Sequence, residues 1–275
     1  MDDLVSAEWL AANINGADLV VVDASWHLDP TRDARAEYEQ RHIPGARFFD
    51  LKALSDPAAS APHMLPSPDQ FGAAMEALGV GTDDRIIVYD DSAIRTSARA
   101  WFMLRHFGAD MVAILDGGLQ GWIAEGYSVS AEPAPPRPAR FTATVAQRQA
   151  VVDKADLLRG AGMAIVDARS AERFAGHSPE PRPGLEPGHI PGSRNLPMGR
   201  LYDYDGRFRS TRELAEAFAE AGVDPARPFI ASCGSGVTAN SLIFAARLLG
   251  NRDARLYDGS WSEWGADPLT PKEQG

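Results

Sequence analysis

The sequence contains only one cysteine, Cys233, in 275 residues. A lone cysteine cannot form a disulfide within the chain, and it cannot supply the several thiolates that structural zinc sites use. Cys233 is therefore either a small buried hydrophobic residue or a reactive thiol. We predict neither a metal nor a cofactor. Four histidines show no ligand spacing and are interpreted as ordinary surface or core residues: His27, His63, His106 and His177.

Clusters of basic residues and long apolar runs are also missing. The chain has 27 Lys and Arg against 38 Asp and Glu, which gives a net charge of −11. Without a basic patch, the counterion release that drives nucleic-acid binding is absent, as is attraction to an anionic membrane surface. No run approaches the roughly 20 apolar residues that span a bilayer, and the first residues are acidic. We therefore expect a cytoplasmic protein with no nucleic-acid partner and no membrane partner.

The bulk composition is that of a globular protein, with 44% hydrophobic and 24% charged residues. A chain of 275 residues is near the length at which one hydrophobic core stops growing. Two domains of roughly 130 residues each are therefore the first expectation.

Self-comparison shows that the sequence is repeated. Arg-His-Ile-Pro-Gly-Ala at 41–46 returns as Gly-His-Ile-Pro-Gly-Ser at 188–193, a separation of 147 positions. Leu-Asp-Gly-Gly at 115–118 returns as Tyr-Asp-Gly-Ser at 257–260, a separation of 142 positions. The two halves are copies with a few insertions between them.

A proline-rich segment separates the two copies. Residues 132–138 read Glu-Pro-Ala-Pro-Pro-Arg-Pro, and repeated prolines favour an extended strap over a helix or a central strand. We therefore predict a first domain over 1–130, a linker over 131–149 and a second domain over 150–275.

Each half alternates the signals of strands and helices. Short apolar runs at 18–23, 85–89 and 229–232 have the length of buried parallel strands. A Ser-Pro start and a Gly end predict a helix over 67–79, and a second helix is expected over 238–249. The pattern is typical of the α/β class, with a mainly parallel sheet flanked by helices in each half.

Cys233 lies between a predicted strand and a predicted helix, as does Asp91, which is 142 positions earlier. The carboxyl ends of strands are the usual ligand site in such sheets. The loop Cys-Gly-Ser-Gly-Val-Thr at 233–238 contains Gly234 and Gly236, which permit positive φ and inward-facing amides. Such a loop, followed by a helix N-terminus, would stabilise a thiolate. The alternative is an ordinary glycine-containing turn with a buried cysteine.

Three motifs together resemble the tandem rhodanese family, and within it the 3-mercaptopyruvate sulfurtransferases. They are the duplicated His-Ile-Pro-Gly, the Asp-Gly-Ser-Trp-Ser-Glu-Trp at 258–264 and the loop at 233–238. The resemblance covers about residues 4 to 264. It implies two rhodanese-like domains, the second of which is catalytic and carries sulfur on Cys233 as a persulfide. The first domain would lack a nucleophile, which Asp91 fits.

The loop also bears on the sulfur donor. Thiosulfate-using relatives carry Arg-Lys where this chain has Gly234 and Ser235. Two unit charges ~4 Å apart interact by about 4 kcal/mol at an effective dielectric of 20, so a dianionic donor loses that attraction here. Spacing alone would make Arg173 and Arg182 solvated charges, but the resemblance implies that they hold the carboxylate and keto oxygens of mercaptopyruvate. The remaining expected substrate-binding residues belong to the loop: Gly234, Gly236, Val237 and Thr238.

Ser235 follows the cysteine by two positions, where its hydroxyl could relay a proton from the substrate thiol to the departing enolate. The mechanism proposed for the family pairs such a serine with a histidine and an acid. In relatives the first His-Ile-Pro-Gly motif lies near the domain interface, so we choose His42 as the histidine and Asp33 as its possible orienting acid. His42 has a structural alternative as a cap on its turn, because its copy His189 occupies the same motif.

Three other functions are weighed against this one. A thiosulfate:cyanide sulfurtransferase is disfavoured by the neutral loop. A rhodanese-fold phosphatase has a longer loop that ends in an arginine, where this chain has Ala239. Inert rhodanese-like binding modules tend to lose the cysteine. The resemblance implies mercaptopyruvate as donor and cyanide or a thiol, thioredoxin among them, as acceptor. Without a second cysteine, the persulfide cannot be resolved within the chain.

Overall fold

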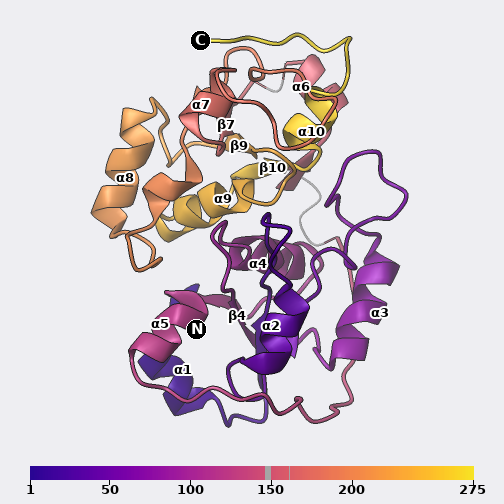
Figure 1. The fold of residues 1–275 in the computed structure, drawn as a ribbon, viewed down its shortest axis with the longest axis vertical. Helices are drawn as coiled ribbons and strands as arrows, with labels where there is room; N and C mark the ends of the chain where they lie inside the picture. The colour runs from indigo at the N-terminus through magenta and orange to yellow at the C-terminus, as the bar shows by residue number, and fades with distance from the viewer. Residues whose placement is uncertain (146–149, 161) are drawn as a thin grey trace. The chain divides into compact units, whose positions relative to one another are not determined.

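The computed structural model describes residues 1–145, 150–160 and 162–275. The chain divides into two compact units, each with its own sheet, as the duplicated sequence predicts (Figure 1). Unit 1 comprises Met1–Ser55, Leu65–Gln147 and Tyr204–Phe208, and unit 2 comprises Asp56–Met64, Arg148–Asp203 and Arg209–Gly275.

Neither unit is one continuous stretch of the sequence. Residues 56–64 of the first half belong to unit 2, and residues 204–208 of the second half belong to unit 1. Residues 131–145 of the predicted linker belong to unit 1, and its residues 146–149 lie outside the described residues. Contiguous boundaries read from the sequence therefore miss the exchange of two short segments.

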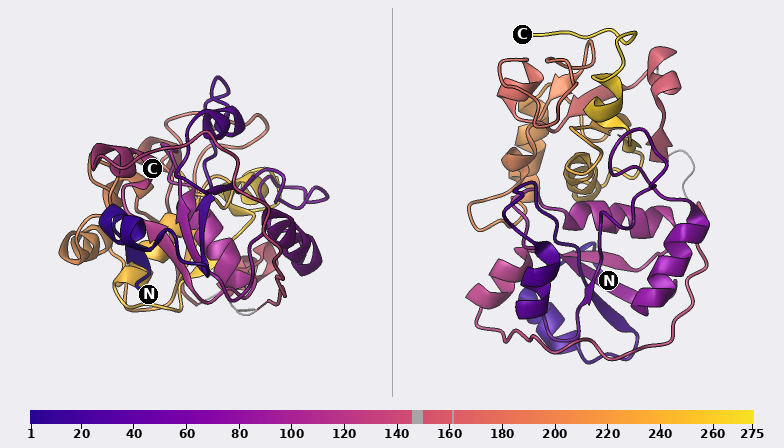
Figure 2. Two further views of the ribbon diagram at one scale, coloured as in Figure 1. Left: turned by 90° about the horizontal axis from the view of Figure 1, so that it is seen from below. Right: turned by 45° about the vertical axis from the view of Figure 1, so that its right-hand side comes forward.

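Unit 1 contains a five-stranded sheet in the order β1-β5-β4-β2-β3, and every pair is parallel. Figure 2 shows its strands, in indigo to magenta, between helices of the same colours, which is where parallel connections place helices. The elements are β1 (Leu4–Val5), α1 (Ala7–Asn13), β2 (Leu19–Asp23), α2 (Ala34–Gln40), β3 (Arg47–Phe48), α3 (Pro68–Leu78), β4 (Arg85–Tyr89), α4 (Ser97–His106), β5 (Val112–Leu115) and α5 (Gly118–Ala124).

Unit 2 repeats this arrangement, with the strand order β6-β10-β9-β7-β8 and all pairs parallel. Strand by strand this is the order of unit 1, so the sequence repeat is also a repeat of topology. The elements are β6 (Val151–Val152), α6 (Lys154–Leu158), β7 (Ala164–Asp167), α7 (Ala171–Phe174), β8 (Arg194–Asn195), the 3₁₀ helix η2 (Met198–Leu201), α8 (Thr211–Glu220), β9 (Phe229–Ser232), α9 (Ala239–Leu248), β10 (Arg255–Tyr257) and α10 (Ser260–Trp264).

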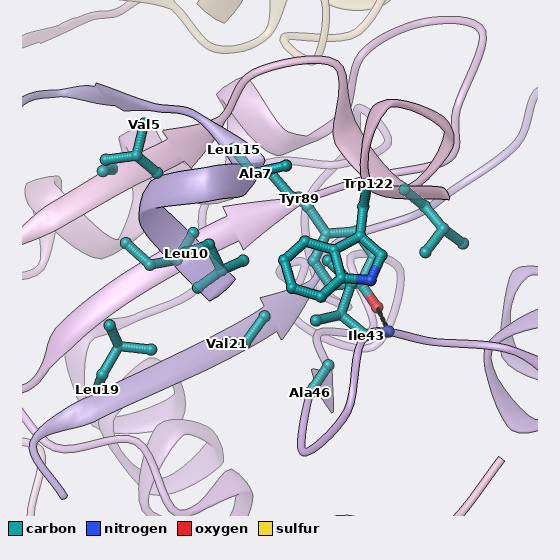
Figure 3. Close-up of a cluster of buried hydrophobic side chains, with 13 residues drawn as sticks. Val5, Ala7, Leu10, Leu19, Val21, Ile43, Ala46, Tyr89, Leu115 and Trp122 are labelled. Atoms are coloured by element: carbon teal, nitrogen blue, oxygen red, sulfur yellow. Dashed lines mark hydrogen bonds between the residues drawn. The ribbon is translucent and has the colours of Figure 1, made fainter. Parts of the chain in front are cut away.

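One face of the unit 1 sheet is covered by α1 and α5 (Figure 3). Leu10 of α1 and Trp122 of α5 pack with Val21 of β2 and Tyr89 of β4, all of them buried. Because side chains alternate along a strand, the intervening buried residues such as Val88 point to the opposite face. Both faces are thus covered, which explains why the strands read as continuous apolar runs.

Local sequence signals set the ends of α3. Ser67 accepts a hydrogen bond from the backbone N–H of Gln70, whose side chain reaches back to the Ser67 amide in a capping box. Pro68 stands in the first turn, and Gly79 ends the helix with a φ of 72°. The predicted helix is therefore confirmed at both ends.

The two equivalent loops follow β4 in unit 1 and β9 in unit 2. β9 ends at Ser232 and α9 begins at Ala239, so Cys233 is the first residue beyond the strand. Asp91 comes two residues after β4 ends at Tyr89, ahead of α4. The predicted placement at the carboxyl ends of the strands is confirmed. Over the described ranges, no helix is long and apolar enough to span a membrane.

Candidate active site

Cys233 is a buried free cysteine that is fixed through its backbone. Its N–H donates to the hydroxyl of Ser260 at 3.1 Å, and its carbonyl accepts from the N–H of Trp261 at 2.9 Å. The Ser260 hydroxyl also lies 3.9 Å from the sulfur, within the range of a weak hydrogen bond. These contacts come from the Asp-Gly-Ser-Trp motif, which places this motif and the cysteine loop in one site.

Ser260 holds this position at a conformational cost. Its φ is 50°, in the left-handed region that disfavours residues with a side chain, and it is fully buried. The equivalent residue of unit 1 is Gly118, with a φ of 57° and no such cost. A backbone strain of about 1–3 kcal/mol in unit 2 alone, at a hydroxyl beside the sulfur, points to function rather than folding.

The loop at 233–238 exposes several amide groups. Among the described residues, the backbone N–H groups of Gly234, Ser235, Val237 and Thr238 have no protein acceptor. Asn240 donates to the carbonyls of Gly236 at 2.7 Å and Val237 at 2.9 Å, so these carbonyls are held from the α9 side. Thr238 makes no side-chain cap and its own N–H is one of these free amides, so the positive end of α9 lies beside them and favours an anion.

The two glycines of the loop have different reasons for being glycine. Gly236 has a φ of 72°, and a Cβ there would lie 2.5 Å from the carbonyl oxygen of Asp258. Gly234 does not have a positive φ, so the expectation that both glycines adopt it is wrong for Gly234. A Cβ on Gly234 would instead lie 3.0 Å from Nη2 of Arg173. Gly234 therefore makes room for a guanidinium group.

Arg182 reaches the same loop through Ser262. Its Nη1 donates to the Ser262 hydroxyl at 3.2 Å, and that hydroxyl donates to the carbonyl of Gly234 at 2.6 Å. Burial and the nearby charge of Arg173 lower the pKa of Arg182, while a charge on Cys233 and the carboxylate of Glu180 raise it. The guanidinium is thus close enough to the sulfur to interact with its charge.

Arg173 is oriented by Glu180. Its Nη2 donates to Oε2 of Glu180 at 2.5 Å, and its Nε lies 3.3 Å from Oε1. Both predicted arginines therefore lie against the 233–238 loop at Gly234, one directly and one through Ser262.

Ser235 is hydrogen-bonded to His63, whose Nδ1 lies 3.1 Å from the hydroxyl oxygen. Both side chains are buried in unit 2, and His63 has a φ of 62°, unusual for a residue other than glycine. The interpretation of His63 as an ordinary residue missed this contact. Residues 56–64 have no helix or strand period and no repeated motif, so only the isolated Pro-His-Met could have drawn attention to it.

His42 is engaged by backbone carbonyls of unit 1. Its Nδ1 lies 2.6 Å from the carbonyl of Tyr38, and its Nε2 lies 3.0 Å from that of Glu132. Its copy His189 behaves alike, with Nδ1 2.8 Å from the carbonyl of Phe174 and the ring stacked on Phe174. This shared geometry supports the structural alternative for His42, whose catalytic role stays an untested prediction.

Asp33 is bound to backbone amides rather than to His42. It is the N-cap of α2, and its carboxylate accepts from the N–H groups of Arg35 at 3.0 Å and Ala36 at 3.1 Å. Both ring nitrogens of His42 have carbonyl partners, so the expected Asp33 to His42 contact is not formed. The hydrogen bonds of Asp33 are those of a helix cap.

Asp91 lies beside a cavity of about 510 Å³ in unit 1. Its Oδ1 accepts from the side-chain amide of Gln120 at 2.9 Å, and its Oδ2 lies 3.7 Å from Nη2 of Arg32 and 4.0 Å from that of Arg41. A carboxylate held in this way cannot carry a sulfane sulfur. Of the two copies, only the one in unit 2 has a sulfur nucleophile.

Comparison with known proteins agrees with this architecture. Residues 6–125 and 151–267 each match the Rhodanese-like domain. The chain is 41% identical over 273 residues to the 3-mercaptopyruvate sulfurtransferase of Rattus norvegicus, covering 95% of this chain and 91% of that protein. It is also 41% identical over 283 residues to the thiosulfate sulfurtransferase of Rattus norvegicus, covering 99% and 95%. Overall identity therefore does not separate these two kinds of relative.

A solved structure shows the same likeness. The crystal structure of SseA from Escherichia coli, described as a 3-mercaptopyruvate sulfotransferase with the rhodanese fold, matches with a TM-score of 0.87 at 40% identity. The match covers 96% of this chain and 100% of that chain. The fold, the duplication and the sequence similarity thus agree over nearly the whole chain.

Proposed function

Because the chain belongs to the rhodanese family, we propose that it moves a sulfane sulfur from 3-mercaptopyruvate to a thiol or to cyanide through a persulfide on Cys233. One observation carries this proposal. Cys233, the chain's single cysteine, is buried at the start of a loop with four free amides and interacts electrostatically with Arg182. That environment suits a thiolate nucleophile and an anionic donor.

The first half-reaction breaks a carbon–sulfur bond. The Cys233 thiolate attacks the sulfur of mercaptopyruvate, a sulfur–sulfur bond forms, and the electron pair of the broken bond passes to the enolate of pyruvate. The proton of the substrate thiol must move to the enolate carbon for pyruvate to leave. Cys233 then holds the sulfur as a persulfide anion, stabilised by the loop amides and the positive end of α9.

Ser235 and His63 supply the group that moves this proton. The Ser235 hydroxyl lies two residues from the nucleophile, and its hydrogen bond to His63 lets it accept one proton while it gives up another. His63 thereby takes the role that the sequence assigned to His42. The strained φ of His63 supports a functional constraint on this residue.

Arg182 and Arg173 hold the 2-oxo acid group. Guanidinium forks suit the carboxylate and keto oxygens of a 2-oxo acid, and both lie at Gly234, next to the nucleophile. Thiosulfate, a dianion, would gain more from the additional loop charges that this chain lacks at 234 and 235. Mercaptopyruvate is therefore the favoured donor.

In the second half-reaction an acceptor removes the sulfur. Cyanide or a thiol attacks the outer sulfur of the persulfide, and the Cys233 thiolate is released. Thioredoxin is one thiol acceptor of the required chemistry, since its exposed thiols could both accept the sulfur and release it. The cytoplasmic location expected from the sequence is compatible with such acceptors and stays a prediction.

Steady-state turnover with mercaptopyruvate and thiosulfate, measured side by side with cyanide as acceptor, tests the proposal. We expect the larger kcat/KM for mercaptopyruvate. A larger kcat/KM for thiosulfate would replace the proposal with thiosulfate:cyanide transfer.

A further inference from the structure

Glu180 lies between two guanidinium groups beside the active-site loop. Its side chain is 2% exposed; Oε1 accepts from Nη1 of Arg169 at 2.7 Å, and Oε2 accepts from Nη2 of Arg173 at 2.5 Å. Arg169, fully buried, also donates to Asp167 at 2.7 Å. Two carboxylates and two guanidinium groups therefore form one continuous, electrically balanced chain.

This cluster of balanced charges reaches the catalytic loop at two of its members. Arg169 lies over the ring of Trp261, 4.5 Å from its centroid, and the N–H of Trp261 donates to the carbonyl of Cys233. Arg173, which ends the cluster, lies so near the loop that a Cβ on Gly234 would come within 3.0 Å of its Nη2. Glu180 thus fixes a guanidinium that lies against Gly234 of the loop.

The guanidinium groups of the site differ in whether a carboxylate balances their charge. The charge of Arg173 is balanced by Glu180, and the charge of Arg169 is balanced by Asp167. Arg182 donates to the neutral hydroxyl of Ser262 and, over the described residues, has no carboxylate within ion-pair distance. The donor therefore meets one uncompensated positive charge, which matches a monoanion better than a dianion.

We propose that Glu180 is a specificity-determining residue, which cancels the charge of Arg173 and thereby selects a monoanionic sulfur donor over a dianionic one. The inference rests on the proposed function, because it concerns the choice of donor by the same site. Glu180 acts through Arg173 and is a positioning residue rather than a catalytic one. At Arg182, the charge of Arg173 lowers the pKa of the guanidinium and the charge of Glu180 raises it, so the two charges oppose each other there.

The test uses Glu180→Gln and Glu180→Asp in the full chain. Gln keeps the size of the side chain and one acceptor oxygen, and Arg169 keeps Asp167 as its partner, so the buried cluster retains its packing. In Glu180→Gln, the ratio of kcat/KM for thiosulfate to that for mercaptopyruvate should rise about tenfold, which corresponds to about 1.4 kcal/mol. Glu180→Asp keeps the charge and should hold the wild-type ratio even where turnover falls.

A second readout does not depend on either donor. Iodoacetate is an anion and iodoacetamide is neutral, so the ratio of their alkylation rates at Cys233 reports the charge that the site presents. This ratio should rise about tenfold in Glu180→Gln and stay at the wild-type value in Glu180→Asp. Glu220→Gln is the matched control, because it removes an exposed carboxylate, paired with Arg200, from the same unit.

Equal ratios in wild type and Glu180→Gln, for both the donors and the alkylating reagents, would overturn the proposal. A rise of the same size in Glu220→Gln would also overturn it, because net charge alone would then explain the effect. If the wild-type protein does not turn over mercaptopyruvate, the proposed function fails, and the alkylation ratio still decides the role of Glu180.

Discussion

His63 and Ser235 are 172 positions apart in the chain, and their side chains are joined by a hydrogen bond of 3.1 Å inside unit 2. The bond exists because residues 56–64, which belong to the first half of the sequence, are part of the second unit. The contact at the nucleophile's own loop, which we propose as a proton relay, is therefore assembled from both halves of the sequence.

Replacing either member of this pair should slow the chemical step. We expect His63→Gln and Ser235→Ala each to lower kcat for mercaptopyruvate about a hundredfold, which is the usual scale of a proton-transfer contribution. Because the two residues act as a unit, the double variant should be no slower than the slower single variant. Steady-state kinetics of the three variants gives this comparison.

His42→Gln is the matched control for that pair. Both His42 ring nitrogens bond to backbone carbonyls, so this substitution should lower the thermal midpoint while kcat of the remaining folded protein stays near that of wild type. A hundredfold loss of kcat in His42→Gln, with His63→Gln unaffected, would restore His42 to the catalytic role predicted from the sequence.

Arg182 should contribute to donor binding in proportion to its charge-assisted hydrogen bonds. Removal of a guanidinium that pairs with a carboxylate costs roughly 1.5 to 3 kcal/mol, so Arg182→Ala should lower kcat/KM for mercaptopyruvate by about ten- to a hundredfold. Arg182→Lys keeps the charge but loses the planar fork and should recover only part of this loss. Iodoacetamide should still alkylate Cys233 at a near-normal rate in both variants. Full turnover in Arg182→Ala would contradict the role in donor binding and show that this arginine is structural.

Exchange of Gly234 and Ser235 for Arg and Lys should shift the donor preference towards thiosulfate. The change adds two positive charges beside the nucleophile, which attract a dianion more than a monoanion. The ratio of kcat/KM values for thiosulfate and mercaptopyruvate measures the effect. Gly234→Ala is the control for shape, since it adds only the Cβ that approaches Nη2 of Arg173 to 3.0 Å. If the exchanged protein and Gly234→Ala had the same donor ratio, loop charge would not determine the donor preference.

Much of the fold follows from local signals in the sequence. The strand runs at 85–89 and 229–232 have the bounds of β4 and β9, and the caps predicted at 67 and 79 flank α3, because apolar runs and caps act over a few residues. Arg173 and Arg182 also lie against the loop that begins at Cys233, and their role in binding stays a prediction. The Ser235 to His63 contact could not be predicted in this way. It depends on residues 56–64, which have no repeated pattern and belong to unit 2 although they lie in the first half of the sequence.

The two copies also differ in ways that only the structure makes plain. Asp167 of unit 2 is paired with buried Arg169, whereas its counterpart Asp23 has Ser25 nearby and accepts from the Ser25 N–H at 2.9 Å. Burial raises the pKa of Asp23 to about 6, from its usual 3.8. The motif Val-Asp-Ala is the same in both halves, but the next residue decides whether the carboxylate is paired.

This difference makes the stability of unit 1 depend on pH. An acid whose pKa rises on folding holds its proton more tightly in the folded state, so the stability it contributes is full below 3.8 and is lost as pH rises through about 6. Asp23→Asn should escape this loss, gaining up to about 3 kcal/mol at pH ~8 and little at pH ~4.

Urea unfolding of wild type and Asp23→Asn across this pH range measures the gain. Asp167→Asn is the matched control and should lose stability near neutral pH, because it leaves the buried charge of Arg169 without one of its partners. A difference between Asp23→Asn and wild type that does not change with pH would contradict the raised pKa of Asp23.

The most direct test of the account is the intact mass of the protein after incubation with mercaptopyruvate. Wild-type protein should gain one sulfur atom, about 32 Da, on Cys233 and should lose it when cyanide is added, because the thiolate is the nucleophile that the mechanism requires. The Cys233→Ser protein should show neither change and should not release pyruvate. Sustained turnover of mercaptopyruvate by Cys233→Ser, or turnover by wild type without the added sulfur, would contradict the central claim.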